Sequence, residues 1–221
     1  MDDALTKALW RSRNTIFEVL EDRGYNPSEK YLKMEYVDFC EWHKNTQQGQ
    51  VIMDDHTMIL SKRIGRTEHV IYVFWITEIS SPNLGKITSI VQSTEYPENP
   101  KIKKRNINVI VVSYNDSKHP SKDFIAKIHE LGLQHFTVYT INELQYNISK
   151  HKYVPKHRVV PKKEAKVILG DYSLQKKSMP KLLSTDPMVR HIGAIPGDVV
   201  EIDRPIVTQP GYFELVYKIV S

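Results

Sequence analysis

The most constraining feature of this sequence is a short apolar run in the middle of the chain. Ile107–Ser113 reads Ile-Asn-Val-Ile-Val-Val-Ser and is apolar at nearly every position. Strands with apolar residues at successive positions are buried on both faces, and such strands lie at the centre of a sheet covered by helices. The run therefore predicts a central strand of an α/β layer.

The segments that follow predict the rest of a βαβ unit. Residues 121–131 have the spacing of a helix, with Ser121 as N-cap and Gly132 at its end. His135–Thr140 is again rich in β-branched and aromatic residues. Strand, helix and strand with short connections predict a parallel pair. The apolar positions of the helix are Phe124, Ile125, Ile128 and Leu131.

The N-terminal half contains further predicted elements. Residues 4–23 read as an amphipathic helix that Gly24 ends. Its apolar stripe is Leu5, Leu9, Ile16 and Leu20, with Trp10 and Phe17 beside it. Three segments are rich in β-branched and aromatic residues and are predicted as strands: Val51–Leu60, His69–Ile76 and Lys86–Gln92.

The amino-acid composition changes near residue 147, and we predict two domains, 1–146 and 147–221. Residues 150–190 contain 11 Lys and Arg against three acids, with prolines spaced through them. Pro161 suits the first turn of a helix with Ala165, Ile168, Leu169 and Tyr172 on its apolar face. Asp186-Pro187 predicts a second helix that Gly193 ends. Gly197 then turns into Val199–Asp203, which pairs with Tyr212–Val220 as a hairpin.

The positive charge is unevenly distributed. Residues 1–100 contain 11 Lys and Arg against 15 Asp and Glu, whereas the remainder contains 20 against 11. Such a division indicates two functional halves, the second facing an acidic partner, although a solvated basic surface has the same composition.

The sequence favours a protein without catalytic residues, metal or cofactor. A single cysteine, Cys40, excludes an internal disulfide framework and cysteine-rich zinc sites and indicates a reducing compartment. No glycine-rich phosphate loop, nucleophile elbow, signal peptide or membrane-spanning apolar stretch is present. A magnesium nuclease needs carboxylates on its core strands, but the strands predicted at 107–113 and 135–140 have none. Asp54-Asp55 is better explained as a turn.

The best candidate for nucleic-acid contact is the loop Asn115–Lys122. It joins a buried strand to a helix N-terminus, where main-chain N–H groups and the helix dipole favour a phosphate. Lys118 and Lys122 add positive charges that attract any DNA sequence. An ordinary βα connection remains the alternative. The expected DNA-binding residues are Lys118, His119, Pro120, Ser121 and Lys122. The other basic cluster, Lys101–Arg105, fits a nuclear localisation or DNA-contact segment or a solvated connection.

The C-terminal third carries a series of motifs in a distinctive order. They are His151-Lys-Tyr-Val-Pro-Lys-His157, Met179-Pro-Lys-Leu182, Asp186-Pro-Met-Val-Arg-His-Ile-Gly193 and Gly197-Asp-Val-Val-Glu-Ile-Asp-Arg204, with a Lys/Glu-rich helix after the first. This order resembles the assembly domain of the fifth-largest subunit shared by the three eukaryotic nuclear RNA polymerases. It also resembles the archaeal counterpart of that domain, a small RNA polymerase subunit in which the same module stands alone.

The N-terminal part is similar to the same eukaryotic subunit. Leu9-Trp10-Arg11 and Asp22-Arg23-Gly24-Tyr25 look like the opening helix of its jaw domain. His119-Pro120-Ser121 falls where that jaw has a Pro-Ser loop. The chain departs from the family pattern at Pro161, at His191 and at Gly211–Phe213. These departures indicate a divergent lineage, either a fast-evolving cellular copy or a homologue from a large DNA virus.

The resemblance implies a fold and a function. The expected fold is an α/β jaw domain, a nuclease-like layer without catalytic residues, followed by a small α+β assembly domain. The expected function is a non-catalytic RNA polymerase subunit that docks on the largest subunit, contacts other subunits and approaches downstream duplex DNA. It would work in the nucleus if cellular, or in the host cytoplasm and virion if viral. A free-standing, sequence-independent DNA-binding protein is the alternative. The expected assembly residues are His151, Val154, Pro155, Lys156, His157, Asp186, Pro187, Arg190, Gly193, Gly197 and Arg204.

Overall fold

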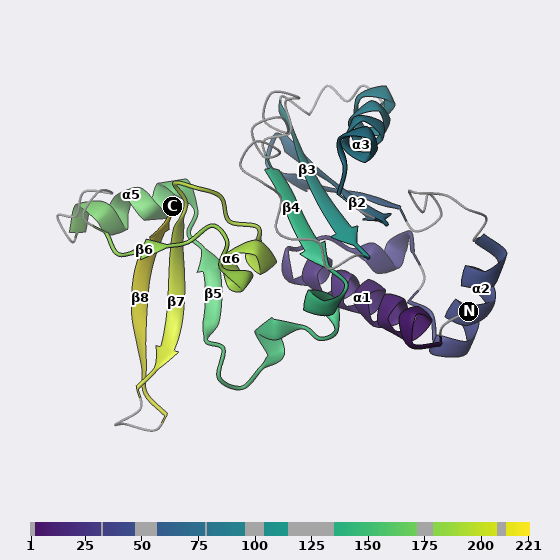
Figure 1. Ribbon diagram of the computed structural model, residues 1–221. Coiled ribbons are helices and arrows are strands. Elements are labelled where there is room, and N and C mark those ends of the chain that lie inside the picture. The colour runs from purple at the N-terminus through teal and green to yellow at the C-terminus, as the bar shows by residue number, and fades with distance from the viewer. Residues whose placement is uncertain are drawn as a thin grey trace. The chain divides into compact units, whose positions relative to one another are not determined.

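The described part of the chain divides into two compact units, Met1–Tyr146 and Asn147–Ser221 (Figure 1). The computed structural model describes residues 3–31, 33–46, 57–77, 79–95, 104–114, 135–171, 179–206 and 211–221. Each unit contains its own four-stranded sheet, and the sequence pattern explains the form of each.

The first sheet has the strand order β1-β2-β3-β4. β1 (Met58–Ile64) and β2 (Thr67–Ile76) form an antiparallel hairpin, with Gly65 at φ 61° in the turn. β2, β3 (Lys104–Ser113) and β4 (His135–Thr140) run parallel. The predicted parallel pairing of the 107–113 and 135–140 strands is therefore confirmed.

The central strand β3 is buried on both faces, as its apolar run predicts. Ile110 and Val112 belong to the cluster beneath α1 (Asp3–Asp22) and α2 (Tyr36–Thr46). Val109 and Val111 belong to the cluster beneath α3 (Ser81–Ser93). Side chains alternate between the faces of a strand, so each face buries its own set of apolar residues.

The N-terminal helix α1 confirms the predicted helix, with one correction to its apolar stripe. Leu9, Ile16 and Leu20 are at most 2% exposed, whereas Leu5 is 48% exposed. Leu5 lies in the first turn, before the helix reaches the core. The short turn η1 (Pro27–Glu29) then leads to α2.

The predicted strand Lys86–Gln92 is wrong, because these residues lie in helix α3. Ser80 occupies the N-cap position and proline follows in the first turn, which favours a helix start. Leu84, Ile87 and Val91 are buried and recur at spacings of three and four, so one helix face packs on the sheet. The β-branched content of the segment concealed this period.

The strand predicted at Val51–Leu60 is confirmed only from Met58 onward, because residues 51–56 lie outside the described residues. The predicted helix at 121–131, residues 101–103 of the basic cluster and Asp54-Asp55 also lie outside them. η3 (Asn142–Leu144) ends the first unit, where Gln145 donates to the carbonyl of Ala8 over 3.1 Å.

The second unit has the sheet order β5-β7-β8-β6. β7 (Val199–Pro205) and β8 (Phe213–Val220) form the predicted hairpin, and α5 (Lys162–Asp171) and α6 (Pro187–Ile192) are the two predicted helices. The two helices pack on opposite faces of the sheet, α6 on one apolar cluster and α5 on the other. The sequence did not predict the flanking elements η4 (Ile148–Lys150), β5 (Lys156–Val159) and β6 (Lys181–Leu182).

Candidate functional site

The most sharply defined local structure among the predicted assembly residues is helix α6. The Asp186 side chain accepts from the main-chain N–H groups of Met188 and Val189, at 2.8 and 3.4 Å. Pro187 follows at the helix start, and Gly193 ends the helix in the left-handed conformation at φ 70°. Capping and termination are thus encoded at both ends, and both were predicted.

Gly197 carries the turn between α6 and the hairpin. Its φ of 91° is a conformation that side chains disfavour, and its N–H donates to the carbonyl of Val220. Asp198 then accepts from the N–H of Ile195 at 3.1 Å. The turn therefore fixes the start of β7 against the end of β8.

The His151–His157 segment lies beside α6, which packs against both η4 and β5. His151 is exposed, and its carbonyl accepts from the N–H of Val154 in a turn. The Nδ1 atom of His157 is 2.7 Å from the carbonyl of Pro155, which fixes the ring beside the chain. This geometry agrees with a structural histidine.

The predicted assembly residues divide by exposure. The half-buried ones are Val154, Pro155, His157, Asp186 and Arg190. The exposed ones are His151, Lys156, Pro187, Gly193, Gly197 and Arg204. The structure brings the 151–157 segment and α6 together, whereas Gly197 and Arg204 lie toward opposite ends of β7. The half-buried members and the exposed Pro187, Gly193 and Gly197 shape the fold, whereas the exposed side chains of His151, Lys156 and Arg204 offer a surface.

An ion-pair cluster that the sequence did not predict joins three elements of this unit. The Arg158 guanidinium on β5 bonds to both oxygens of Glu164 on α5, at 2.7 and 3.0 Å. It also bonds to both oxygens of Glu201 on β7, again at 2.7 and 3.0 Å. These bonds raise the pKa of Arg158 and lower the pKa of Glu164.

The same cluster gives Glu164 a structural role. The Glu164 carboxylate lies on helix α5 and forms an ion pair with Arg158 of β5. The sequence contains both charges, Arg158 on β5 and Glu201 on β7, but their proximity follows only from the register in which the two strands pair.

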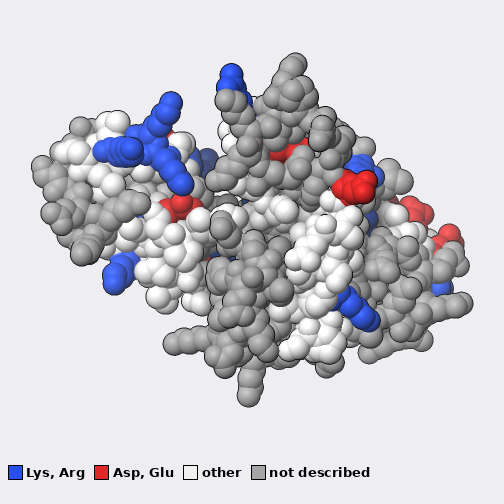
Figure 2. Space-filling view, turned by 90° about the horizontal axis from the view of Figure 1, so that it is seen from above, with Lys and Arg blue, Asp and Glu red and all other residues white. Residues whose placement is uncertain are grey.

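The second unit displays mainly positive side chains. Figure 2 shows Lys and Arg gathered on the C-terminal unit, at the left of the view, beside a small acidic area. Lys156 and Arg204 are exposed and lie on neighbouring strands, but on opposite faces of the sheet, because Lys156 is opposite Asp203 and Arg204 is the next residue along β7. Each position suits an acidic or polar partner.

The first unit contains a buried arginine that the sequence did not predict. Arg13 is 4% exposed, and its guanidinium lies over the rings of Phe17 and Trp42, 5.5 and 5.0 Å from their centroids. Burial lowers the pKa of Arg13 to about 10. Aromatic faces stabilise such a cation, so Arg13 joins α1 to α2.

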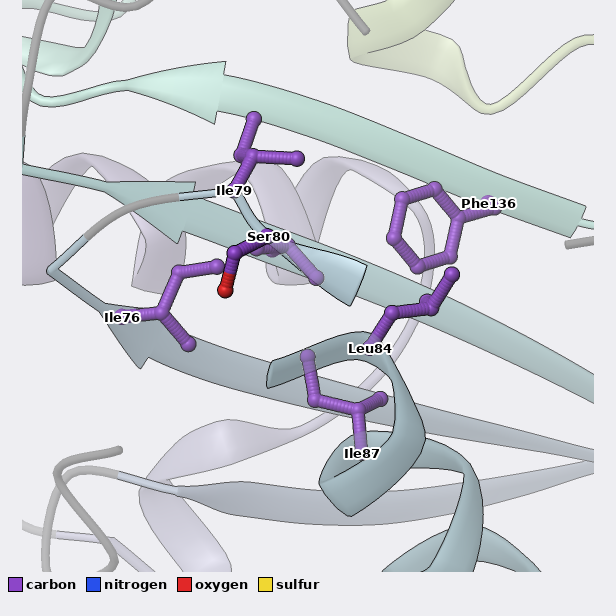
Figure 3. A pocket seen from close by; sticks show the side chains of 7 residues that line it. Ile76, Ile79, Ser80, Leu84, Ile87 and Phe136 are labelled. Carbon is purple, nitrogen blue, oxygen red and sulfur yellow. The ribbon is translucent and has the colours of Figure 1, made fainter. Parts of the chain in front are cut away.

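The part of the chain that the structure describes shows no group of three His, Cys, Asp or Glu that could hold a metal. A small hollow beneath α3 is lined by Ile76, Ile79, Leu84, Phe136 and other apolar side chains, with the Ser80 hydroxyl as a polar group (Figure 3). Within the same residues, no helix is long and apolar enough to cross a bilayer.

The predicted DNA-contact residues Lys118, His119, Pro120, Ser121 and Lys122 lie outside the described residues. The strands on either side of this segment are described. β3 ends at Ser113 and the parallel strand β4 begins at His135. The segment therefore connects two parallel neighbours in the sheet.

Comparison with known proteins gives the family. The chain matches the model of the RNA polymerase Rpb5 N-terminal domain over residues 3–114 and that of the C-terminal domain over residues 146–220. It is 27% identical over 222 residues to a Caenorhabditis briggsae protein, DNA-directed RNA polymerases I, II, and III subunit RPABC1, covering 99% of this chain and 98% of that one.

Two further relatives are also named as RNA polymerase subunits. DNA-directed RNA polymerase subunit 5-like protein 1 of Arabidopsis thaliana is 27% identical over 214 residues, 96% of each chain. DNA-directed RNA polymerase subunit Rpo5 of Methanococcus maripaludis is 39% identical over 71 residues, which cover 31% of this chain and 91% of the archaeal one. The two domain models together span most of the chain in the expected order, and the protein belongs to the RNA polymerase Rpb5 family.

Proposed function

We propose that the C-terminal unit docks this chain onto the largest subunit of a DNA-directed RNA polymerase, and that the N-terminal unit contacts downstream DNA. The chain is a non-catalytic subunit of that enzyme, and other polymerase subunits are its partners. It acts in the nucleus if it is cellular; a viral copy would act in the host cytoplasm and the virion.

The observation that carries the docking proposal is the arrangement around α6. A helix with both ends fixed packs against β5, and the exposed side chain of Arg204 lies on the same face of the sheet as α6. The exposed side chain of Lys156 lies on the other face. A rigid element beside a charged surface supports selective binding without a large change of shape on association. Residues 147–221 act as the assembly domain in this proposal, and residues 1–146 as the jaw.

Affinity purification tests the docking proposal. The tagged chain should recover the two largest polymerase subunits, and Lys156→Glu with Arg204→Glu should reduce recovery by about tenfold or more, since each 1.4 kcal/mol of lost binding is a factor of ten. Arg63→Glu with Arg66→Glu is the matched control, because both residues are exposed in the other unit. Equal recovery from both double variants would show that neither basic position belongs to the docking site.

The segment Lys118–Lys122 is proposed to contact DNA because it includes Ser121, the predicted N-cap of the helix at 121–131, and carries two lysines. In the assembled polymerase, Lys118→Ala with Lys122→Ala should weaken crosslinking to downstream duplex and leave subunit recovery unchanged. Loss of recovery would instead make the segment structural. The alternative, a free-standing DNA-binding protein, predicts salt-sensitive duplex binding by the isolated chain at micromolar affinity.

A further inference from the structure

Strand β8 has an outer edge that its own sheet covers only at one end. β8 pairs with β7 from Phe213 to Ile219, but β6 reaches it only at Ile219 and Val220. Figure 1 shows β6 beside the upper end of β8, and the hairpin extending well past it. The rest of the outer edge faces no strand among the described residues.

The hydrogen bonds of the hairpin show which residues point outward. Tyr212 accepts from the N–H of Ile206 and Val220 donates to Asp198, so the even-numbered residues of β8 bond to β7. Ile219 is odd-numbered, and its N–H donates away from β7, to the carbonyl of Pro180. By the same alternation, Phe213 and Leu215 direct their main-chain N–H and C=O groups outward.

The side chains at this edge are large, apolar and exposed. Tyr212 is 66% exposed, Phe213 60% and Leu215 58%. Phe213 and Leu215 lie on the same face as Tyr217 and Ile219, which pack in the cluster beneath α5. Among the described residues, α5 covers that face only at the β6 end, so the apolar face continues uncovered toward the turn of the hairpin. We name Phe213–Val216 the open edge.

The open edge lacks the protection that the outer strands β5 and β1 have. The outer strand β5 carries Lys156 and Arg158, and the outer strand β1 carries Lys62 and Arg63. Charged side chains of this kind discourage strand addition. The open edge reads Phe-Glu-Leu-Val, with Glu214 as its one charge.

We propose that the open edge receives an extended strand from another subunit of the polymerase, by strand addition to the β5-β7-β8-β6 sheet. This proposal rests on the proposed function. Main-chain groups of Phe213 and Leu215 supply the hydrogen bonds, and their side chains pair with apolar residues two apart on the added strand. Glu214 points to the opposite face, where a Lys or Arg of the added strand would pair with it.

A second copy of this chain is a poorer occupant. The side chains of Phe213 and Leu215, each about three-fifths exposed, offer about 200–250 Å² of apolar area, well below the roughly 800 Å² that each partner buries in a stable complex. A strand of a subunit already held in the assembly is presented at about millimolar effective concentration and needs no more area than this. The occupant therefore belongs to the assembly.

Photo-crosslinking in the assembled polymerase tests this inference. A photoreactive phenylalanine analogue replaces Leu215 in the tagged full-length chain, and the crosslinked peptide is identified by mass spectrometry. The matched control carries the analogue at Leu183, which is 65% exposed in the same unit. We expect a crosslink from position 215 to one short segment of a polymerase subunit with apolar residues at alternate positions.

Substitution provides the second arm. Leu215→Lys places a charge on the open edge and should lower recovery of that subunit by about tenfold, whereas Leu183→Lys should not. Leu215→Thr serves if Leu215→Lys affects folding. It introduces a β-branched residue, which suits a strand, and should lower recovery in the same direction with an unchanged thermal midpoint.

The outcomes separate the two proposals. If position 215 crosslinks only to a second copy of this chain, or if the Leu215 variants recover the subunit as well as Leu183→Lys does, the strand-addition proposal is overturned while the proposed function stands. If the unmodified tagged chain recovers no polymerase subunit, the proposed function itself fails.

Discussion

The two sheets of this protein are stabilised in different ways. The sheet of the first unit has a central strand buried on both faces and an apolar cluster on each side. The sheet of the second unit has smaller clusters, and its elements are joined by a helix cap, a glycine turn and an exposed arginine with two carboxylates. Even the arginines differ, since Arg13 is buried between rings and Arg158 is exposed.

This difference indicates that the two units draw their stability from different kinds of interaction. Burial of apolar area is the dominant favourable term in folding, so the larger clusters of the first unit contribute more to its stability than the smaller clusters contribute to that of the second. The second unit relies on local interactions of about 1 kcal/mol each and leaves basic and apolar groups on its surface. A unit of that kind gains further stability when a partner binds.

The tryptophans allow the two units to be followed separately. Trp10, Trp42 and Trp75 all lie in the first unit, and the second has none. Tryptophan fluorescence therefore reports unfolding of the first unit. Hydrogen exchange measured on peptides reports the second.

The largest effect is expected from the core of the first sheet. Ile110→Ala removes a side chain that is 0% exposed at the centre of β3 and should cost about 2–5 kcal/mol of unfolding free energy. Urea unfolding followed by tryptophan fluorescence measures it. Ile64→Ala, at a position 57% exposed, is the control and should change stability by about 0.5 kcal/mol or less. A similar loss in both variants would contradict the picture of a sheet stabilised by its apolar core.

The next effect concerns the cap of α6. Asp186→Ala leaves the N–H groups of Met188 and Val189 without their acceptor and should cost the second unit about 0.5–2 kcal/mol. Faster hydrogen exchange in α6 with unchanged tryptophan fluorescence would locate the loss. Asp186→Asn retains a capping oxygen and should behave nearly as the unchanged chain does. If Asn and Ala cost the same, the carboxylate acts through its charge and the capping explanation is wrong.

The elements predicted correctly are those whose signal is local. The apolar run of β3, the Asp186-Pro187 start and the Gly193 end each depend on neighbouring residues, and the structure confirms them. The strand predicted at 86–92 failed because β-branched content was given more weight than the helical spacing of Leu84, Ile87 and Val91.

Features that depend on distant residues could not be predicted. β5 can be assigned as a strand only from its pairing with β7, because four residues are too few to show the alternation of a strand. The Arg158 cluster needs that register, and the burial of Arg13 needs the meeting of α1 with α2. For the candidate site, motif order gave the family, whereas the open edge of β8 required the strand order of the sheet.

Lowering the pH should destabilise the first unit over a pH range set by the pKa of His43. His43 is 1% exposed and stacks on Phe39 with ring centroids 5.5 Å apart, and burial lowers its pKa from 6.5. The unfolded chain then binds a proton that the folded unit excludes, so stability is full above pH 6.5 and is lost as pH falls through the lowered pKa. In urea unfolding followed by tryptophan fluorescence, His43→Phe should flatten this pH dependence. An unchanged slope in the variant would assign the titration to another group.

The smallest effect is expected at Arg158, and it should lie in the second unit and at lower pH. Hydrogen bonds from Arg158 lower the pKa of Glu164 below 4.5, so the ion pair stabilises above pH 4.5 and is lost as pH falls through the lowered pKa. Arg158→Met should therefore speed hydrogen exchange in α5 near neutral pH and make little difference in acid. About 1 M salt should reduce the effect, because exposed charges are screened. Arg204→Met, an exposed arginine on the same sheet, is the control and should leave α5 unchanged. If α5 exchanges equally fast in both variants, the second unit does not depend on this cluster, and apolar burial stabilises both sheets alike.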